Sequence, residues 1–141
     1  MKSKRTLSRE YAVQMMYHSS IAEVGVSEVR RIFWLEKDAP DTVKTFAEEL
    51  FSNAFKKKNF NDELVKKYLK KGWVFERLGE IEKAVFRVGI AELFDGDAPV
   101  YAILDDYVSI ASNYMDEKSA SLVNGILDTI KREFNIDRSV D

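Results

Sequence analysis

The sequence predicts an all-α fold of about seven helices arranged in two small packed bundles. The 141 residues include only two prolines and six glycines, and most of these stand where helix boundaries are expected. Apolar residues recur every three or four positions along most of the chain, which is the spacing of one helix face. With 45% apolar and 33% charged residues, one globular domain is expected over 1–141. A modest change in composition near Gly72 suggests an N-terminal bundle at about 1–71 and a C-terminal bundle at about 72–135.

The first two helices are expected before residue 40. Leu7 and Tyr11 begin a row of residues four positions apart, which predicts a helix over about 6–24 that ends at Gly25. Ser27 is the expected cap of a short second helix, because its hydroxyl can accept a hydrogen bond from a free backbone N–H.

The third and fourth helices are expected to form a hairpin. Pro40 opens the third helix, which ends at the lysine run 56–58, where cations meet the negative end of the helix dipole. The fourth helix is expected over about 59–69, and Gly72 follows its end. Residues 73–77 then form a connector that places aromatic side chains in the core.

Three more helices are expected in the C-terminal half. The fifth covers about 78–94. Pro99 suits the first turn of the sixth helix, where its missing N–H costs nothing. Ser119 is the expected cap of the seventh helix, and the residues after Phe134 are expected to form a frayed tail.

Gly125 interrupts the apolar pattern of the seventh helix, although glycine inside a helix costs about 1 kcal/mol relative to alanine. The periodicity continues past it, so we interpret this glycine as a point of close helix crossing, with Gly89 of the fifth helix as its counterpart. Gly125→Leu is therefore expected to overpack the crossing and destabilise the fold.

The composition excludes several chemical roles. There is no cysteine, so thiol nucleophiles and cysteine-ligated metals are excluded, and the single histidine, His18, cannot form a multi-histidine metal site. No phosphate-binding loop, dinucleotide fingerprint or hydrolase motif occurs. Acidic neighbours such as Asp105 and Asp106 point in different directions on a helix and are expected to be solvated. We therefore expect no catalytic residue, no metal and no cofactor.

The distribution of charge is more informative than the net charge of −2, which argues against a strongly basic nucleic-acid binder. The first nine residues hold four cations and no acid. The lysines of 56–71 surround Tyr68, and three acids cluster at 76–82. Each cluster can be a solvated face. Alternatively, the cations can bind RNA and the acids can dock a basic partner.

No run of 18 or more apolar residues occurs, so no membrane span is expected. No apolar signal segment follows the basic start of the chain either. The protein is therefore expected to be cytoplasmic.

Three segments carry a family resemblance: SREYAVQMMY at 8–17, RLGEIEKAVFRVGIAELF at 77–94 and LVNGILD at 122–128, with Pro99 between the last two. In order and spacing they resemble the NusB family of bacterial antitermination factors, whereas residues 25–70 match only in helical pattern. The resemblance implies an all-helical protein of two small bundles without catalytic activity. It also implies pairing with NusE, a small-subunit ribosomal protein, and binding to single-stranded boxA RNA. The pair would join an antitermination complex with RNA polymerase that promotes ribosomal RNA transcription.

The resemblance also assigns site residues. The RNA-binding residues are Lys2, Lys4, Arg5, Arg9, Tyr68, Glu117 and Lys118. The partner-binding residues are Tyr17, Glu76 and Glu82. The chain departs from the family at 6–8, where arginines are common, and at Ser121-Leu122, where the family has Lys-Phe. A monomer or weak homodimer is expected.

Two alternative functions stay open. One is a helical protein–protein adaptor on the same fold with weak or lost RNA binding, which the negative net charge and Ser121-Leu122 favour. The other is an enzyme related to ribosomal RNA methyltransferases that carry a NusB-like domain, which binding of S-adenosylmethionine would support. RNA retention by the protein together with NusE separates the adaptor from the RNA-binding factor.

Overall fold

The computed structural model describes residues 2–138, which contain seven α-helices and no strand. The helices are α1 (Lys4–Ala22), α2 (Val26–Phe33), α3 (Asp41–Lys56), α4 (Lys58–Tyr68), α5 (Glu80–Asp95), α6 (Val100–Tyr114) and α7 (Glu117–Glu133), and a short 3-10 helix, η1 (Phe75–Arg77), precedes α5. The predicted all-α class is confirmed, and each predicted helix is present.

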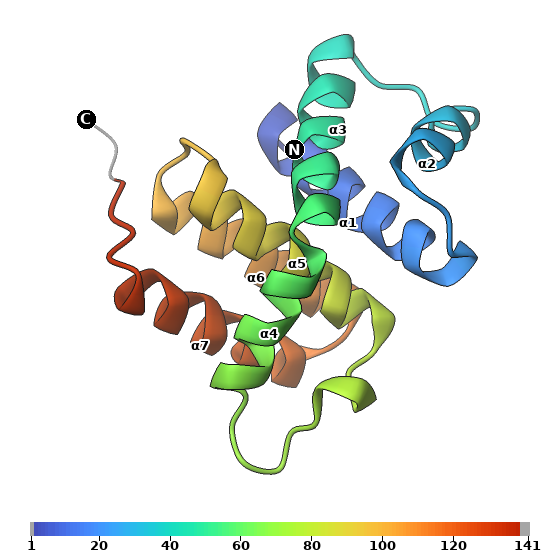
Figure 1. Cartoon of the computed structure of the whole chain (residues 1–141). Helices are drawn as coiled ribbons and strands as arrows, with labels where there is room; N and C mark the ends of the chain where they lie inside the picture. Colours follow the sequence, from blue (N-terminus) through green and yellow to red (C-terminus); the bar gives the residue numbers. More distant parts are fainter. Residues whose placement is uncertain (1, 139–141) are drawn as a thin grey trace.

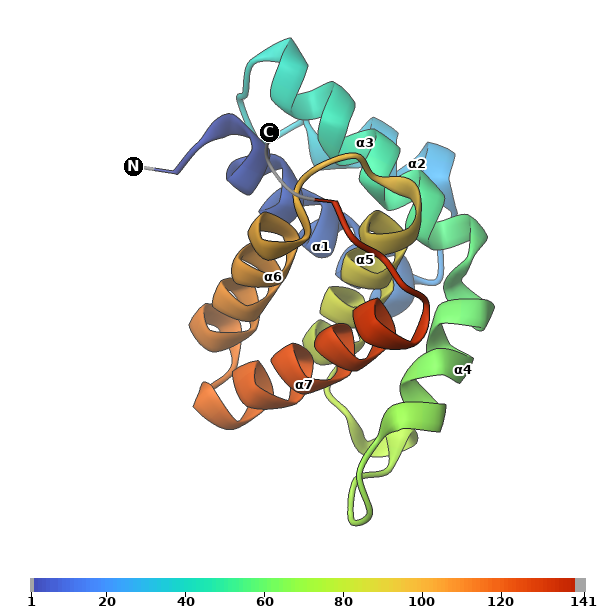
Figure 2. The same cartoon turned by 90° about the vertical axis from the view of Figure 1, so that its left-hand side faces the viewer.

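Helix α5 lies at the centre of the fold and contacts α1, α3, α4, α6 and α7 (Figures 1 and 2). Its residues 84–91 are buried without interruption, because neighbours surround it. In Figure 2, α7 runs between α6 and α4 and contacts both. One hydrophobic cluster extends through both halves of the chain. The division into two bundles near Gly72 stays a prediction.

Two predicted helix caps are wrong. Gly25 is the N-cap of α2, so Ser27 lies inside the first turn. The N-cap of α7 is Asp116, whose carboxylate accepts a hydrogen bond from the backbone N–H of Ser119 at 2.8 Å. Ser119 is buried, and its hydroxyl donates to Glu82 Oε2 at 2.6 Å. Periodicity located both helices but did not distinguish between neighbouring residues that are equally suited to a cap.

The expected close crossing of Gly125 and Gly89 is also wrong. A Cβ at Gly125 would meet no atom within 4 Å, because this glycine is exposed. A Cβ at Gly89 would lie 3.2 Å from Tyr107 Cγ and 3.5 Å from Leu127 Cδ1. The space beside Gly89 is therefore filled by larger side chains, and overpacking by Gly125→Leu is not expected.

Residues 134–138 pack on the fold rather than fraying as predicted, and the last part of the predicted tail, 139–141, lies outside the described residues. Ile136 lies against the hydrophobic core. The carbonyl of Arg138 accepts a hydrogen bond from the backbone N–H of Val100 at 3.0 Å, and its guanidinium donates to the carbonyl of Ala98 at 3.1 Å. These contacts fix residues 134–138 across the junction between α5 and α6.

Candidate nucleic-acid interface

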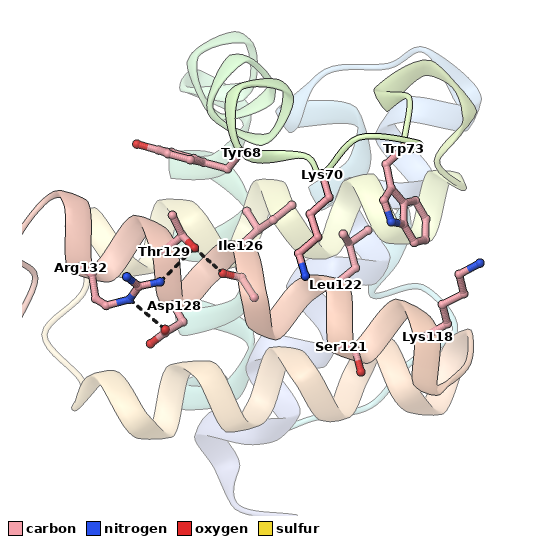
Figure 3. A pocket seen from close by; sticks show the side chains of 11 residues that line it. Tyr68, Lys70, Trp73, Lys118, Ser121, Leu122, Ile126, Asp128, Thr129 and Arg132 are labelled. Carbon is pink, nitrogen blue, oxygen red and sulfur yellow. Dashed lines mark hydrogen bonds and ion pairs between the residues drawn. The ribbon is translucent and has the colours of Figure 1, made fainter.

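A pocket of about 480 Å³ lies between the end of α4, the loop that follows it and the outer face of α7 (Figure 3). Tyr68 and Trp73 stand at opposite ends of this pocket, and the side chain of Lys70 extends between them. Lys118 lines the same pocket from the start of α7. The fold thus brings together two of the residues assigned to RNA binding, Tyr68 and Lys118.

One face of α7 forms the floor of the pocket. Leu122, Gly125 and Thr129 share this face, because they are spaced three and four positions apart along the helix. Leu122 and Ile126 supply apolar surface and are themselves almost completely buried. Gly125 has no side chain, and Ser121 has a short one, so this face is open. The departure at Ser121-Leu122 therefore forms part of the floor.

Ammonium groups lie beside both aromatic rings. Lys118 Nζ is 5.2 Å from the centre of the Trp73 ring, and Lys67 Nζ is 5.3 Å from the centre of the Tyr68 ring. Lys70 brings a third ammonium group into the pocket. Cation–π contacts orient an ammonium group without neutralising it. The pocket thus combines flat aromatic surfaces with positive charge.

Trp73 packs against the hydrophobic core, as expected of the connector, but it was not selected as a site residue. Its side chain is only half-buried and lines the pocket. A signal was present, because this tryptophan directly follows Lys70, Lys71 and Gly72 in a short connection between helices. Aromatic rings among cations are typical of surfaces that bind single-stranded nucleic acids.

The N-terminal arm, defined as residues 2–9, offers less free charge than its sequence suggests. Lys2 forms an ion pair with Glu10. Arg5 stacks its guanidinium 3.8 Å from the centre of the Phe46 ring. Lys4 and Arg5 line a separate hollow beside α3.

Arg9, in contrast, is buried, with only 3% of its surface exposed. Its guanidinium donates to Glu92 at 2.8 Å through Nε and 2.7 Å through Nη2, and to Asp106 at 2.9 Å through Nη1. The Tyr107 hydroxyl donates to Glu92 at 2.8 Å. This network joins α1 to α5 and α6, so the guanidinium is bound within the fold, and the expectation that Arg9 contacts RNA stays a prediction. Asp106 was expected to be solvated, but it is half-buried in the same network.

Glu117 and Lys118 open α7 and have different surroundings. Glu117 is exposed and accepts a hydrogen bond from the hydroxyl of Ser112 near the end of α6. Glu117 therefore stabilises the corner between α6 and α7, whereas Lys118 supplies charge to the pocket.

Tyr17 lies on a second groove, of about 430 Å³, between α1 and the end of α2. Tyr17, Ile21 and Leu35 line this groove with exposed fractions of 37%, 57% and 73%. Large apolar side chains that gather on a surface are typical of a protein interface. The groove is therefore a candidate docking surface for a protein partner.

The two acids assigned to partner binding have opposite environments. The side chain of Glu76 is 70% exposed and lies 3.8 Å from Lys66 Nζ. Glu82 is 6% exposed, and its carboxylate accepts hydrogen bonds from the backbone N–H of Gly79 at 2.8 Å and from Ser119. Glu82 therefore fixes the start of α5 against α7, and the expectation that it contacts a partner stays a prediction.

Within residues 2–138, no group of three or more ligating side chains could hold a metal ion. No helix in this range is both long and apolar enough to cross a membrane.

The chain matches the model of the NusB family over residues 6–132. The chain belongs to the NusB family. The transcription antitermination protein NusB of Koribacter versatilis is 29% identical to it over 136 residues, which cover 95% of this chain and 92% of the relative. NusB of Macrococcus caseolyticus is 33% identical over 128 residues, which cover 89% of this chain and 95% of the relative.

A solved NusB structure has the same fold. The crystal structure of the antitermination factors NusB and NusE in complex with double-stranded RNA matches with a TM-score of 0.83 at 26% identity. The match covers 94% of this chain and 99% of that chain. The predicted NusB-like fold is therefore confirmed.

The segments that resemble NusB have different structural roles. The segment 8–17 contains the buried Arg9, and 77–94 contains most of the buried helix α5. The segment 122–128 alternates between core residues and the floor of the pocket. Most residues of the three segments that resemble NusB are therefore packed in the interior, and only some of them line the candidate site.

Proposed function

We propose that this chain is a transcription antitermination factor that pairs with NusE and binds boxA RNA. The observation that carries the proposal is the match of nearly the whole chain to the solved structure of NusB with NusE and RNA. The pair joins a complex with RNA polymerase in the cytoplasm and promotes ribosomal RNA transcription. In this role the chain is a monomer or weak homodimer and performs no catalysis.

The proposed RNA surface consists of the pocket between α4 and α7 together with the exposed cations of the N-terminal arm. Tyr68 and Trp73 supply faces on which unstacked bases can lie. Lys118 and Lys70 supply charge inside the pocket, and Lys4 and Arg5 supply it on the arm. Aromatic faces and unneutralised cations together suit a single-stranded RNA better than a protein partner.

The proposed NusE surface consists of the groove at Tyr17 and the exposed acid Glu76. Tyrosine contributes strongly to interfaces, because it buries a large rigid ring and retains a polar hydroxyl. Glu76 is exposed enough to steer a basic partner. NusE is a ribosomal protein, and the surfaces with which ribosomal proteins bind the RNA phosphate backbone are basic. An exposed acid such as Glu76 therefore suits NusE as a partner.

The proposal is tested by fluorescence anisotropy with a labelled boxA RNA, added to the protein alone and to the protein with NusE from the same organism. We expect a stable protein pair and tighter binding of boxA RNA than of a scrambled RNA of equal composition. Failure to form a complex with NusE, together with equal affinity for the two RNAs, would contradict the proposal.

One observation favours a protein–protein adaptor with weak or lost RNA binding. Two of the four cations of the arm offer no free charge, because Arg9 is buried and Lys2 is paired with Glu10. An adaptor would bind NusE in the same assay without any gain in affinity for boxA RNA. Retention of boxA RNA by the protein pair would exclude this alternative.

A further inference from the structure

We propose that three phenylalanines, at the place where α4, α5 and α7 meet, form the interface of a weak homodimer of this chain. They are Phe60 in the first turn of α4, Phe94 in the last turn of α5 and Phe134 directly after α7, and we call them the phenylalanine row. This inference goes beyond the proposed function, because it assigns a separate interaction surface that self-association uses without RNA or NusE.

The first argument is the place where phenylalanine rings are exposed. The chain has nine phenylalanines, and within residues 2–138 only Phe60 and Phe134 are exposed, at 52% and 41%. Both rings contact the half-buried Phe94, with ring centres 6.1 Å and 5.0 Å away. An exposed phenyl ring keeps apolar surface in water and has no polar group of its own. The two exposed rings are therefore gathered at one place, which is typical of an interaction surface.

The position of the row leaves the proposed NusE groove free. In Figure 2 the end of α7 lies beside α4, where the row is located. The groove at Tyr17 lies between α1 and the end of α2. Figure 1 shows α2 and the end of α7 on opposite sides of the molecule. A dimer formed through the row can therefore also bind NusE.

The second argument is the distribution of charge along the row. Ahead of its first ring, Lys56 and Lys58 form no ion pair with a carboxylate within residues 2–138. Beside its middle ring, Lys57 and Asp95 pair with each other at 2.8 Å. Around its other two rings, the exposed charges that form no ion pair in this range are all acids: Asp97, Glu133 and Asp137. One end of the row is therefore positive and the other is negative.

These charges make the row complementary to a second copy of itself. In a dimer with two-fold symmetry, the same patch of both chains is in contact. When the two rows lie antiparallel, the two middle rings meet, and the lysines of each chain face the acids of the other. Opposite charges across an interface fix its orientation. A second copy of this chain is therefore the partner that the charge distribution fits.

The row is small, so the dimer is expected to be weak. A stable interface buries about 800 Å² on each partner, and smaller interfaces are mostly transient. Two half-exposed rings and one half-buried ring supply only the apolar centre of such an interface. Dimers should therefore form at high protein concentration and dissociate on dilution.

The decisive measurement is sedimentation velocity of the full chain over a range of concentrations. We expect a shift from monomer to dimer as the concentration rises. Phe60→Asp and Phe134→Asp should each raise the dissociation constant about tenfold or more, because each places a charge in the apolar centre. Val74→Asp is the matched control, since Val74 is 45% exposed but follows the other end of α4. A chain that stays monomeric at every concentration, or an equal loss with Val74→Asp, would overturn the inference.

Charge reversal tests the antiparallel orientation. Lys56→Glu and Glu133→Lys should each weaken the dimer, because each places like charges opposite one another. The double variant exchanges the charges of the two ends and should restore the affinity. General charge repulsion predicts a different result, because Glu133→Lys adds two positive charges to a net charge of −2 and would then strengthen association. A double variant that stays as weak as the single variants would overturn the inference.

Disulfide cross-linking locates the interface without relying on affinity. The chain has no cysteine of its own, so a single introduced cysteine reports on its surroundings. Under mild oxidation, a mixture of Lys56→Cys and Glu133→Cys proteins should form linked dimers faster than either protein alone, because antiparallel rows bring unlike ends together. Faster linkage of either variant with itself would overturn the inference.

Binding of NusE and RNA by the same variants separates this inference from the proposed function. Phe134→Asp should bind NusE as the unaltered chain does, and the pair should retain boxA RNA. Loss of NusE or RNA binding with unchanged self-association would assign the row to one of those partners and overturn the inference. A monomeric chain that binds NusE and boxA RNA would overturn the inference alone and leave the proposed function intact.

Discussion

The guanidinium of Arg9 binds the carboxylate of Glu92 through two nitrogen atoms, at 2.8 Å and 2.7 Å, in the interior of the protein. Burial by itself lowers the pKa of Arg9, but hydrogen bonds and charge from Glu92 raise the pKa above its ordinary value. Arg9 therefore stays charged, and the Tyr107 hydroxyl adds a further donor to Glu92. Arg9, which the family resemblance assigned to RNA binding, is buried in this fold and holds α1 on α5.

Arg9→Ala should destabilise the fold by about 3–5 kcal/mol, because it leaves the buried Glu92 without its cation. Chemical denaturation measures the change. Lys4→Ala, on the exposed face of the same helix, is the control and should change stability by no more than about 0.5 kcal/mol. An Arg9→Ala protein with unchanged stability but lost RNA binding would return Arg9 to the RNA surface.

Gly89 and Gly125 should respond to alanine in opposite directions. Gly125→Ala should stabilise the protein by about 1 kcal/mol, since the methyl group meets open space and alanine favours the helix. Gly89→Ala should destabilise it by about 1–3 kcal/mol, because the ring of Tyr107 is fully buried and held by Glu92. Thermal denaturation of the two variants measures the change in melting temperature. Equal changes in both variants would contradict the assignment of Gly89 to a packed site and Gly125 to an open one.

Ser119→Ala should destabilise the protein by about 1–3 kcal/mol, because Glu82 Oε2 loses a hydrogen-bond donor in a buried place. Ser121→Ala on the same helix is the control, since Ser121 is exposed and should contribute less than about 0.5 kcal/mol. Urea denaturation distinguishes the two. A cost at Ser121 equal to that at Ser119 would be inconsistent with the buried contact.

The start of α7 should lose stability in acid. The backbone N–H of Ser119 donates to Asp116 and lowers the pKa of that carboxyl below its ordinary value of 3.8. Because the pKa of Asp116 is depressed in the folded state, the stability that this hydrogen bond contributes is fully present above the ordinary pKa. That stability is lost as the pH falls through the lowered pKa. Amide exchange at Ser119, followed by NMR across this range, measures the loss. Asp116→Asn should keep the cap and remove the pH dependence.

Glu76→Lys should slow association with NusE, with an effect that fades as salt rises. Glu63→Lys is a closely matched control, because both acids are 70% exposed and lie beside Lys66. Tyr17→Ala should lower NusE affinity about tenfold, as expected of a tyrosine at the centre of an interface. Surface plasmon resonance at two salt concentrations gives both results. Equal effects at Glu63 and Glu76 would indicate general charge attraction instead of a defined contact.

Periodicity was sufficient to predict the helices, because each one buries an apolar face of regular spacing. It could not place single polar residues. Arg9 and Glu82 look like surface charges in the sequence, and only the packing of α1, α5 and α7 shows that both are buried with partners. In the same way, Gly125 looked like a packing residue, but no neighbouring helix covers it.

The candidate site was predicted in part. The family resemblance supplied Tyr68 and Lys118, which the fold brings into one pocket. Lys70 belonged to the lysine-rich stretch 56–71, which the sequence left open as a solvated face or an RNA surface. Trp73 was not selected, because its contribution depends on the path of the loop between α4 and η1. Local sequence carries little information about such a path, since the loop is positioned by the helices at its two ends.

The pairing of Arg9 with Glu92 also sets an order of events during translation. The two residues are 83 positions apart, and Asp106 is 97 positions from Arg9. A ribosome that adds about 5–20 residues per second supplies Glu92 roughly 4–17 s after Arg9. Throughout that interval Arg9 has no buried carboxylate to bind and stays in water. The N-terminal helices therefore complete their native packing only after α5 has left the ribosome. Folding of the N-terminal half is thus finished late in the synthesis of the chain.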